Sequence, residues 1–258
     1  MTPMREFLLI GVGAGDPDYL TLQAIKAINR VDVFFVLDKR AETAELTRFR
    51  RQICEQFATD RPWRFVTLQD PVRDQRRGRY ASVVEAWHDA RAVLLEQAIR
   101  NELEEGQCGA LLLWGDPALY DSAMRLMEII QARGNLALDY RVIPGITSVQ
   151  ALAAGHRVPL NRIGEPVHVT TGRQLAKGFP EDLDAVLVML DGDLSYRKVM
   201  EEDMEIFWGA YLGTEDEILI SGPAKTVTPR IEQARQAGRA AKGWIMDTYL
   251  LRRPRRSD

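Results

Sequence analysis

The chain has 258 residues, of which 46% are hydrophobic, so it can form one large domain or two smaller ones with a full-sized core. This composition excludes an intrinsically disordered protein. The 34 Lys and Arg residues against 37 Asp and Glu give a net charge of −3, so no basic excess indicates a nucleic-acid partner. A small molecule is the expected partner.

The metal-binding residue types are few and scattered. The only cysteines are Cys54 and Cys108, and the only histidines are His88, His156 and His168, none at metal-ligand spacing. We therefore expect neither a disulfide scaffold nor a metal site.

The N-terminal apolar run at residues 7–10 is interrupted by Gly11, and no small-residue cleavage pattern follows it. No stretch has the roughly 20 consecutive apolar residues that span a bilayer. We expect a soluble, cytoplasmic protein with a mature start and no membrane partner.

The first half of the chain predicts an α/β unit. Residues 7–12 predict a buried strand, and a glycine-rich turn leads into a helix with apolar residues at helical spacing from Leu20 to Ile28. Residues 31–37 show almost no polar alternation, which favours a central parallel strand covered on both faces.

The stretch from residue 41 to about 105 is rich in charge and in helix formers. It predicts a helix, a short strand near residues 65–66, an exposed basic loop and a long helix. Residues 109–114 predict a buried strand that ends at Gly115-Asp116-Pro117, and a helix around 124–130 follows.

Beyond residue 143 the pattern changes to short strands joined by tight turns, which indicates a mixed or partly antiparallel sheet. The predicted strands are 167–171, 186–190, 206–212, 218–221 and 244–251, with helices near 196–202 and 229–237 and a solvated tail at 252–256. We therefore predict two α/β domains, 1–143 and 144–258.

The loop with Gly11, Gly13 and Gly15 can turn tightly at a strand end, as in dinucleotide-binding folds. However, the spacing is Gly-x-Gly-x-Gly-Asp, and Asp16 places a negative charge where a pyrophosphate would lie. A nicotinamide cofactor is disfavoured, and a purely structural turn is the alternative.

Asp116 follows a buried strand, at the edge where open α/β sheets bind ligands, and could accept hydrogen bonds from a ribose or an amino group. Thr147 and Ser148 begin the next helix close to the predicted domain boundary. Ordinary turns and helix caps would explain the same residues.

Four motifs resemble those of the tetrapyrrole methylase family, which transfers methyl groups from S-adenosylmethionine onto uroporphyrinogen and precorrin rings. They are GVGAGDPDYLTL at 11–22, LWGDP at 113–117, VIPGITS at 142–148 and TTGR at 170–173. The resemblance implies two α/β domains with the methyl donor bound in the cleft between them, and S-adenosylhomocysteine as a product. It implies no metal.

A long charged insert, at 46–54, 70–74 and 87–91, is similar to that of the deacetylating branch of the family. The resemblance implies methylation of precorrin-5 at carbon 1 with release of acetate, giving precorrin-6A. The alternatives are a sister methyltransferase acting at another ring carbon, and a non-catalytic nucleotide- or tetrapyrrole-binding module. A homodimer is left open.

The resemblance assigns contacts residue by residue. Donor contacts fall on Gly115, Asp116, Leu119, Thr147, Ser148, Leu190, Asp191 and Gly213. Substrate contacts fall on Gly13, Ala14 and Arg173, and other arginines expected to meet the carboxylates of the substrate are Arg40, Arg73, Arg76, Arg77, Arg157 and Arg162. This chain departs from the family pattern at Ala14, Trp114, Asp191 and Leu37.

Methyl transfer from a sulfonium to an electron-rich carbon needs alignment of donor and acceptor rather than a serine, cysteine or metal nucleophile. Proton removal or water activation afterwards needs a carboxylate or a histidine. We expect Asp16 and Asp38 to be the catalytic residues, with Asp191 and His156 as further candidates.

Overall fold

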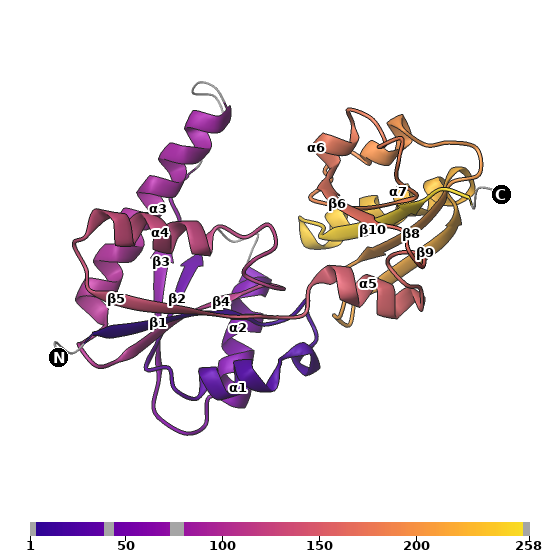
Figure 1. The fold of residues 1–258 in the computed structure, drawn as a ribbon. Helices are drawn as coiled ribbons and strands as arrows, with labels where there is room; N and C mark the ends of the chain where they lie inside the picture. Colours follow the sequence, from indigo (N-terminus) through magenta and orange to yellow (C-terminus); the bar gives the residue numbers. More distant parts are fainter. Residues whose placement is uncertain (1–3, 39–43, 73–79, 255–258) are drawn as a thin grey trace. The chain divides into compact units, whose positions relative to one another are not determined.

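The structure is a computed structural model that describes residues 4–38, 44–72 and 80–254 (Figure 1). The chain divides into two compact units, Met1–Thr147 and Ser148–Asp258. The boundary predicted from the sequence lies between residues 143 and 144.

The first unit contains a five-stranded sheet in the order β3-β2-β4-β1-β5, in which all pairings are parallel. Its strands are β1 (Arg5–Gly11), β2 (Val33–Asp38), β3 (Arg64–Gln69), β4 (Cys108–Leu113) and β5 (Leu138–Ile143). β2 lies between two parallel neighbours, which confirms the central strand predicted from its continuous apolar run.

Helices cover both faces of this sheet (Figure 1). They are α1 (Leu22–Ile28), α2 (Ala44–Phe57), α3 (Tyr80–Glu102) and α4 (Ala123–Arg133), with a short 3₁₀ helix, η1 (Pro17–Tyr19). Successive residues of β1 point to opposite faces. Phe7 and Leu9 pack with α3 and α4, and Leu8 and Ile10 pack with α1 and α2.

The second unit contains a five-stranded sheet in the order β6-β7-β10-β8-β9, in which β6 and β7 are parallel and the other pairs are antiparallel. This confirms the predicted mixed sheet. Its strands are β6 (Val167–Thr171), β7 (Ala185–Met189), β8 (Glu205–Ala210), β9 (Ile218–Pro223) and β10 (Asp247–Arg252). Its helices are α5 (Ser148–His156), α6 (Gly172–Leu175), η3 (Ser195–Lys198) and α7 (Ala224–Lys242).

Three predictions for the second unit were wrong in detail. The helix expected at 196–202 is the single 3₁₀ turn η3, whose first backbone N–H is held by the Asp191 carboxylate. α7 begins before Pro229, which lies inside the helix rather than at its start. The tail expected to be solvated begins with Arg252, which ends β10 and is buried.

In the part of the chain that the structure describes, no helix combines the length and the apolar character needed to cross a membrane.

Candidate methyl-donor site

Three loops of the first unit meet at the carboxyl edge of its sheet. Gly13 and Gly115 form a two-residue antiparallel bridge, with N···O distances of 3.3 and 2.7 Å. A Cβ atom on Gly145 would lie 2.1 Å from the Gly115 carbonyl oxygen, and one on Gly11 would lie 2.7 Å from the Gly145 nitrogen. Only glycine allows the three backbones to approach so closely.

Asp116 links two of these loops through its carboxylate. Its Oδ1 accepts a hydrogen bond from the Ala118 backbone N–H at 2.7 Å, and its Oδ2 accepts one from the Gly145 N–H at 2.8 Å. Each carboxylate oxygen has a second acceptor position, so the half-buried Asp116 can still accept a hydrogen bond from a ligand. Its first role here is to hold the loop after β5 against the loop after β4.

The other residues predicted to bind the donor in the first unit lie in the same two loops. A Cβ atom on Gly115 would lie 3.7 Å from Cα of Thr147, an ordinary contact distance, and Thr147 itself is buried. Leu119 is half-buried, and its N–H donates to the Asp116 carbonyl at 3.3 Å. Gly115, Asp116, Leu119 and Thr147 therefore lie close together in the first unit.

Asp116→Ala is expected to weaken binding of S-adenosylhomocysteine by roughly 5- to 150-fold, because the loop after β5 is no longer held in place and binding must restore its position, with the Gly145 N–H unpaired, at a cost of roughly 1–3 kcal/mol. Calorimetric titration measures the effect. Asp116→Asn, whose amide oxygen can still accept one of the two hydrogen bonds, serves as the graded control. Wild-type affinity in Asp116→Ala would contradict the linking role.

In the second unit, the predicted donor residues Leu190 and Asp191 form the turn after β7. Leu190 has φ 53°, a left-handed conformation uncommon outside glycine, and its side chain is 67% exposed. A strained residue persists only where its surroundings hold it, and such residues gather at ligand sites. Asp191, in contrast, is buried.

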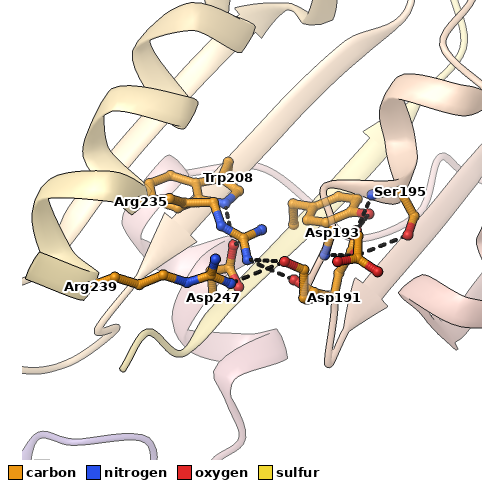
Figure 2. Close-up of polar contacts among 9 residues, drawn as sticks. Asp191, Asp193, Ser195, Trp208, Arg235, Arg239 and Asp247 are labelled. Atoms are coloured by element: carbon orange, nitrogen blue, oxygen red, sulfur yellow. Dashed lines mark hydrogen bonds and ion pairs between the residues drawn. The ribbon is translucent and has the colours of Figure 1, made fainter. Parts of the chain in front are cut away.

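The Asp191 carboxylate is occupied by donors of its own unit (Figure 2). Oδ1 accepts from the Asp193 N–H and the Ser195 hydroxyl, and Oδ2 accepts from the Ser195 N–H and the Tyr249 hydroxyl. This argues against the proton-removing role considered for Asp191. The side chain of Asp191 is therefore engaged within the second unit.

A buried ion pair supports the same turn (Figure 2). Nη1 of Arg235 lies 3.1 Å from Oδ2 of Asp247, and both side chains are 5% exposed. Nη2 of Arg235 donates to the Asp191 carbonyl at 2.9 Å, and the Trp208 indole N–H donates to Asp247 at 2.8 Å. Burial raises the pKa of Asp247, and the Arg235 guanidinium opposes that rise.

This ion pair was not predicted from the sequence. Arg235 lies in the apolar stripe of α7, four residues after the buried Ile231 and three before the buried Gly238. A lone charge on the buried face of a helix was the available signal.

The remaining donor candidates lie in the second unit. The Ser148 hydroxyl is 3.0 Å from that of Thr248. Gly213 has φ +76°, and its N–H donates to Glu217 at 2.8 Å. Nε2 of His156 lies 3.0 Å from the Trp208 carbonyl oxygen, which explains this histidine as a structural residue.

The two predicted catalytic carboxylates lie at strand ends of the first unit. Asp16 follows the glycine loop after β1, and its Oδ1 accepts the Asp18 N–H at 2.8 Å, which caps η1. Asp38 ends β2, and its Oδ1 is buried with no hydrogen-bond partner among the described residues. An unsatisfied buried acceptor is costly unless a ligand or water reaches it.

The predicted substrate contacts are placed only in part. Gly13 and Ala14 are buried in the glycine loop, and Arg173 is exposed on α6. Arg162 is paired with Asp184 at 2.9 Å, so its charge is used within the second unit. Arg157 has φ 56° just after α5. Arg40, Arg73, Arg76 and Arg77 lie outside the described residues.

The family model for Tetrapyrrole (Corrin/Porphyrin) Methylases matches residues 6–228. The chain belongs to the tetrapyrrole methylase family. This confirms the resemblance carried by the four sequence motifs, and both sheets of this tetrapyrrole methylase belong to the family's α/β fold.

Individual relatives of this tetrapyrrole methylase are similar over nearly their whole length. Precorrin-6A synthase (deacetylating) from a Sinorhizobium species is 49% identical over 97% of this chain and 96% of its own. A crystal structure of a cobalamin synthesis related protein (CobF) from Corynebacterium diphtheriae is 38% identical, with a TM-score of 0.82, over 96% of this chain and 98% of that one.

A more distant structure shares the fold alone. It is the uroporphyrin-III C-methyltransferase from Thermus thermophilus, crystallised in complex with S-adenosylhomocysteine, with 17% identity and a TM-score of 0.55 over 95% of this chain and 96% of that one.

Proposed function

We propose that this protein is an S-adenosylmethionine-dependent C-methyltransferase that methylates precorrin-5 at carbon 1 and releases acetate, giving precorrin-6A. The observation that carries the proposal is the 49% identity to a deacetylating precorrin-6A synthase across 97% of the chain. Relatives named for other ring positions, such as the cobalt-precorrin-4 C(11)-methyltransferase of Priestia megaterium, are 24% identical.

S-adenosylmethionine would supply the methyl group as an electrophile on its sulfonium. We propose that this chain holds it with Gly115, Asp116, Leu119 and Thr147 in the first unit, and with Ser148, Leu190, Asp191 and Gly213 in the second. The first set is proposed because its glycines let the loops after β4 and β5 approach each other closely, with little side chain between them. The fit of the second rests on the strained, exposed turn at Leu190.

We propose that Gly13, Ala14 and Arg173 contact the precorrin, and that Asp16 and Asp38 serve the acid–base steps. Asp38 has the stronger structural support, because its buried Oδ1 lacks a partner among the described residues and could orient a water molecule. We also propose that the enzyme is cytoplasmic, uses no metal and takes a precorrin as its small-molecule substrate.

The expected result with purified protein, methyl-labelled donor and a panel of precorrins is transfer to precorrin-5 in preference to the others. Equal transfer to another precorrin would move the protein to a sister activity. Binding of the donor without any S-adenosylhomocysteine formed would instead favour the non-catalytic binding module.

A further inference from the structure

A small cavity of about 80 Å³ lies in the first unit at the carboxyl ends of β2 and β4. Its wall is mostly apolar, with two arginines, one aspartate and one serine on it. The lining residues include Leu37, Arg50, Arg91, Leu113, Asp121, Ser122 and Ala123. We call it the Arg50 cavity.

The Arg50 cavity adjoins the candidate site. Leu113 comes two residues before Gly115, and Asp121 comes two residues after Leu119, so the cavity lies between the two ends of the proposed donor loop. Leu37, on its other wall, immediately precedes Asp38.

Arg50 is the polar group on the cavity wall whose N–H donors are not all used. It lies on the face of α2 that carries the buried Ile53 and Cys54, and its Nε donates to the Leu112 carbonyl at 2.8 Å. Among the described residues it has no carboxylate within 4.0 Å, although Asp121 and Asp38 stabilise its charge at longer range. Burial lowers the pKa of Arg50. Its terminal N–H groups can therefore donate to a ligand in the cavity.

Arg91 differs because its partners already hold it. Its Nε lies 2.8 Å from Asp70, its Nη1 donates to the Ser122 hydroxyl at 2.7 Å, and its guanidinium stacks on Trp87 at 4.4 Å from the ring centre. Arg91 thus forms a fixed wall of the cavity.

We propose that the Arg50 cavity binds the acetyl group of the substrate, with its methyl against the apolar wall and its carbonyl oxygen accepting hydrogen bonds from Arg50. This inference rests on the proposed function. A neutral acetyl group suits the cavity because the charge of Arg50 is offset by Asp121 and Asp38, which would disfavour a resident anion.

The same charges suit the cleavage that follows. The oxygen of a water molecule bonds to the acetyl carbonyl carbon, and the bond from that carbon to the ring breaks. The ring keeps the electron pair of the broken bond, which can take up the methyl group, and acetate leaves while the two protons of the water go to solvent. Arg50 stabilises the oxyanion formed on the carbonyl oxygen, and the carboxylates of Asp38 and Asp121 then repel the acetate product.

The test compares Arg50→Ala with Arg48→Ala, an exposed arginine on the same helix, by measuring acetate release from precorrin-5. We expect the rate of acetate release to fall about 100- to 1,000-fold in Arg50→Ala and to stay unchanged in Arg48→Ala, because a fall of this size follows the loss of an oxyanion donor. Added guanidinium ion should restore part of the Arg50→Ala rate, which a purely structural role would not allow. The affinity for S-adenosylhomocysteine should stay unchanged.

A second variant covers the case in which Arg50→Ala does not fold. Ala123→Leu keeps every charge but fills the cavity, and it should raise the KM for precorrin-5 at least about tenfold. Wild-type acetate release in Arg50→Ala, or wild-type KM in Ala123→Leu, would overturn the inference and leave the proposed function standing. Methyl transfer without acetate release by the wild-type enzyme would overturn both.

Discussion

Replacing Arg235 by methionine is expected to lower the free energy of unfolding by about 3–5 kcal/mol at neutral pH. The substitution leaves the 5% exposed carboxylate of Asp247 without its counter-ion and removes the hydrogen bond to the Asp191 carbonyl. Urea denaturation of the full-length chain measures the loss. Because the turn at Leu190 loses an anchor, the affinity for S-adenosylhomocysteine should fall as well.

Arg197→Met is the matched control. Arg197 pairs with Glu232 of α7, but the two side chains are 51% and 42% exposed, so the expected loss is under about 1 kcal/mol. Equal losses of unfolding free energy in the two variants would show that the stability contributed by the Arg235–Asp247 pair does not depend on its burial.

The loss in Arg235→Met should depend on pH. Burial already raises the pKa of Asp247, and Arg235 opposes this, so its removal raises the pKa further. A carboxyl whose folded-state pKa is raised favours folding at low pH, and that contribution is lost as pH rises through the folded-state pKa. The deficit relative to wild type should therefore be larger at about pH 8 than at about pH 4.5. A stability deficit that does not change with pH would mean that lost packing, rather than the charge of Asp247, causes it.

Gly145→Ala is expected to raise the dissociation constant for S-adenosylhomocysteine by at least about tenfold and to cost about 1–3 kcal/mol of stability. The new Cβ would lie 2.1 Å from the Gly115 carbonyl oxygen, and because that neighbour is backbone, the loops after β4 and β5 must move apart. Calorimetry and urea denaturation measure the two effects.

Gly134→Ala separates this steric effect from the general cost of replacing a glycine. Gly134 caps α4 with φ +65°, and nothing lies within 4 Å of a Cβ added there. The Gly134→Ala variant should lose about 1–2 kcal/mol of unfolding free energy, because alanine is strained in a left-handed conformation, and it should keep its affinity for S-adenosylhomocysteine. Unaltered affinity in Gly145→Ala as well would remove the support that the glycine contacts give to the proposed donor loops.

The sequence predicted the sheets well because hydrophobic runs and their turn residues are local signals. The run at 31–37 became the central parallel strand β2, and the tight turns after residue 143 became a mixed sheet. The limits of α7 were missed because Pro229 is also typical of a helix start.

The polar interior could not be predicted in the same way. Arg50 stands between other charged residues at 48 and 51, and only its spacing from Ile53 and Cys54 marks it as inward-facing. Asp191 aligned with a family contact, yet whether its side chain or its backbone serves that contact depends on Ser195 and Tyr249. Such long-range partners leave no trace in local sequence patterns.

We propose that one enzyme couples methyl transfer to loss of an acetyl group. The measurement that tests it most directly incubates the protein with precorrin-5 and methyl-labelled S-adenosylmethionine, and counts label in the tetrapyrrole and free acetate in the same samples. We predict one acetate per methyl group throughout the reaction, with the label at carbon 1. Label incorporated without acetate, or found at another ring carbon, would contradict it.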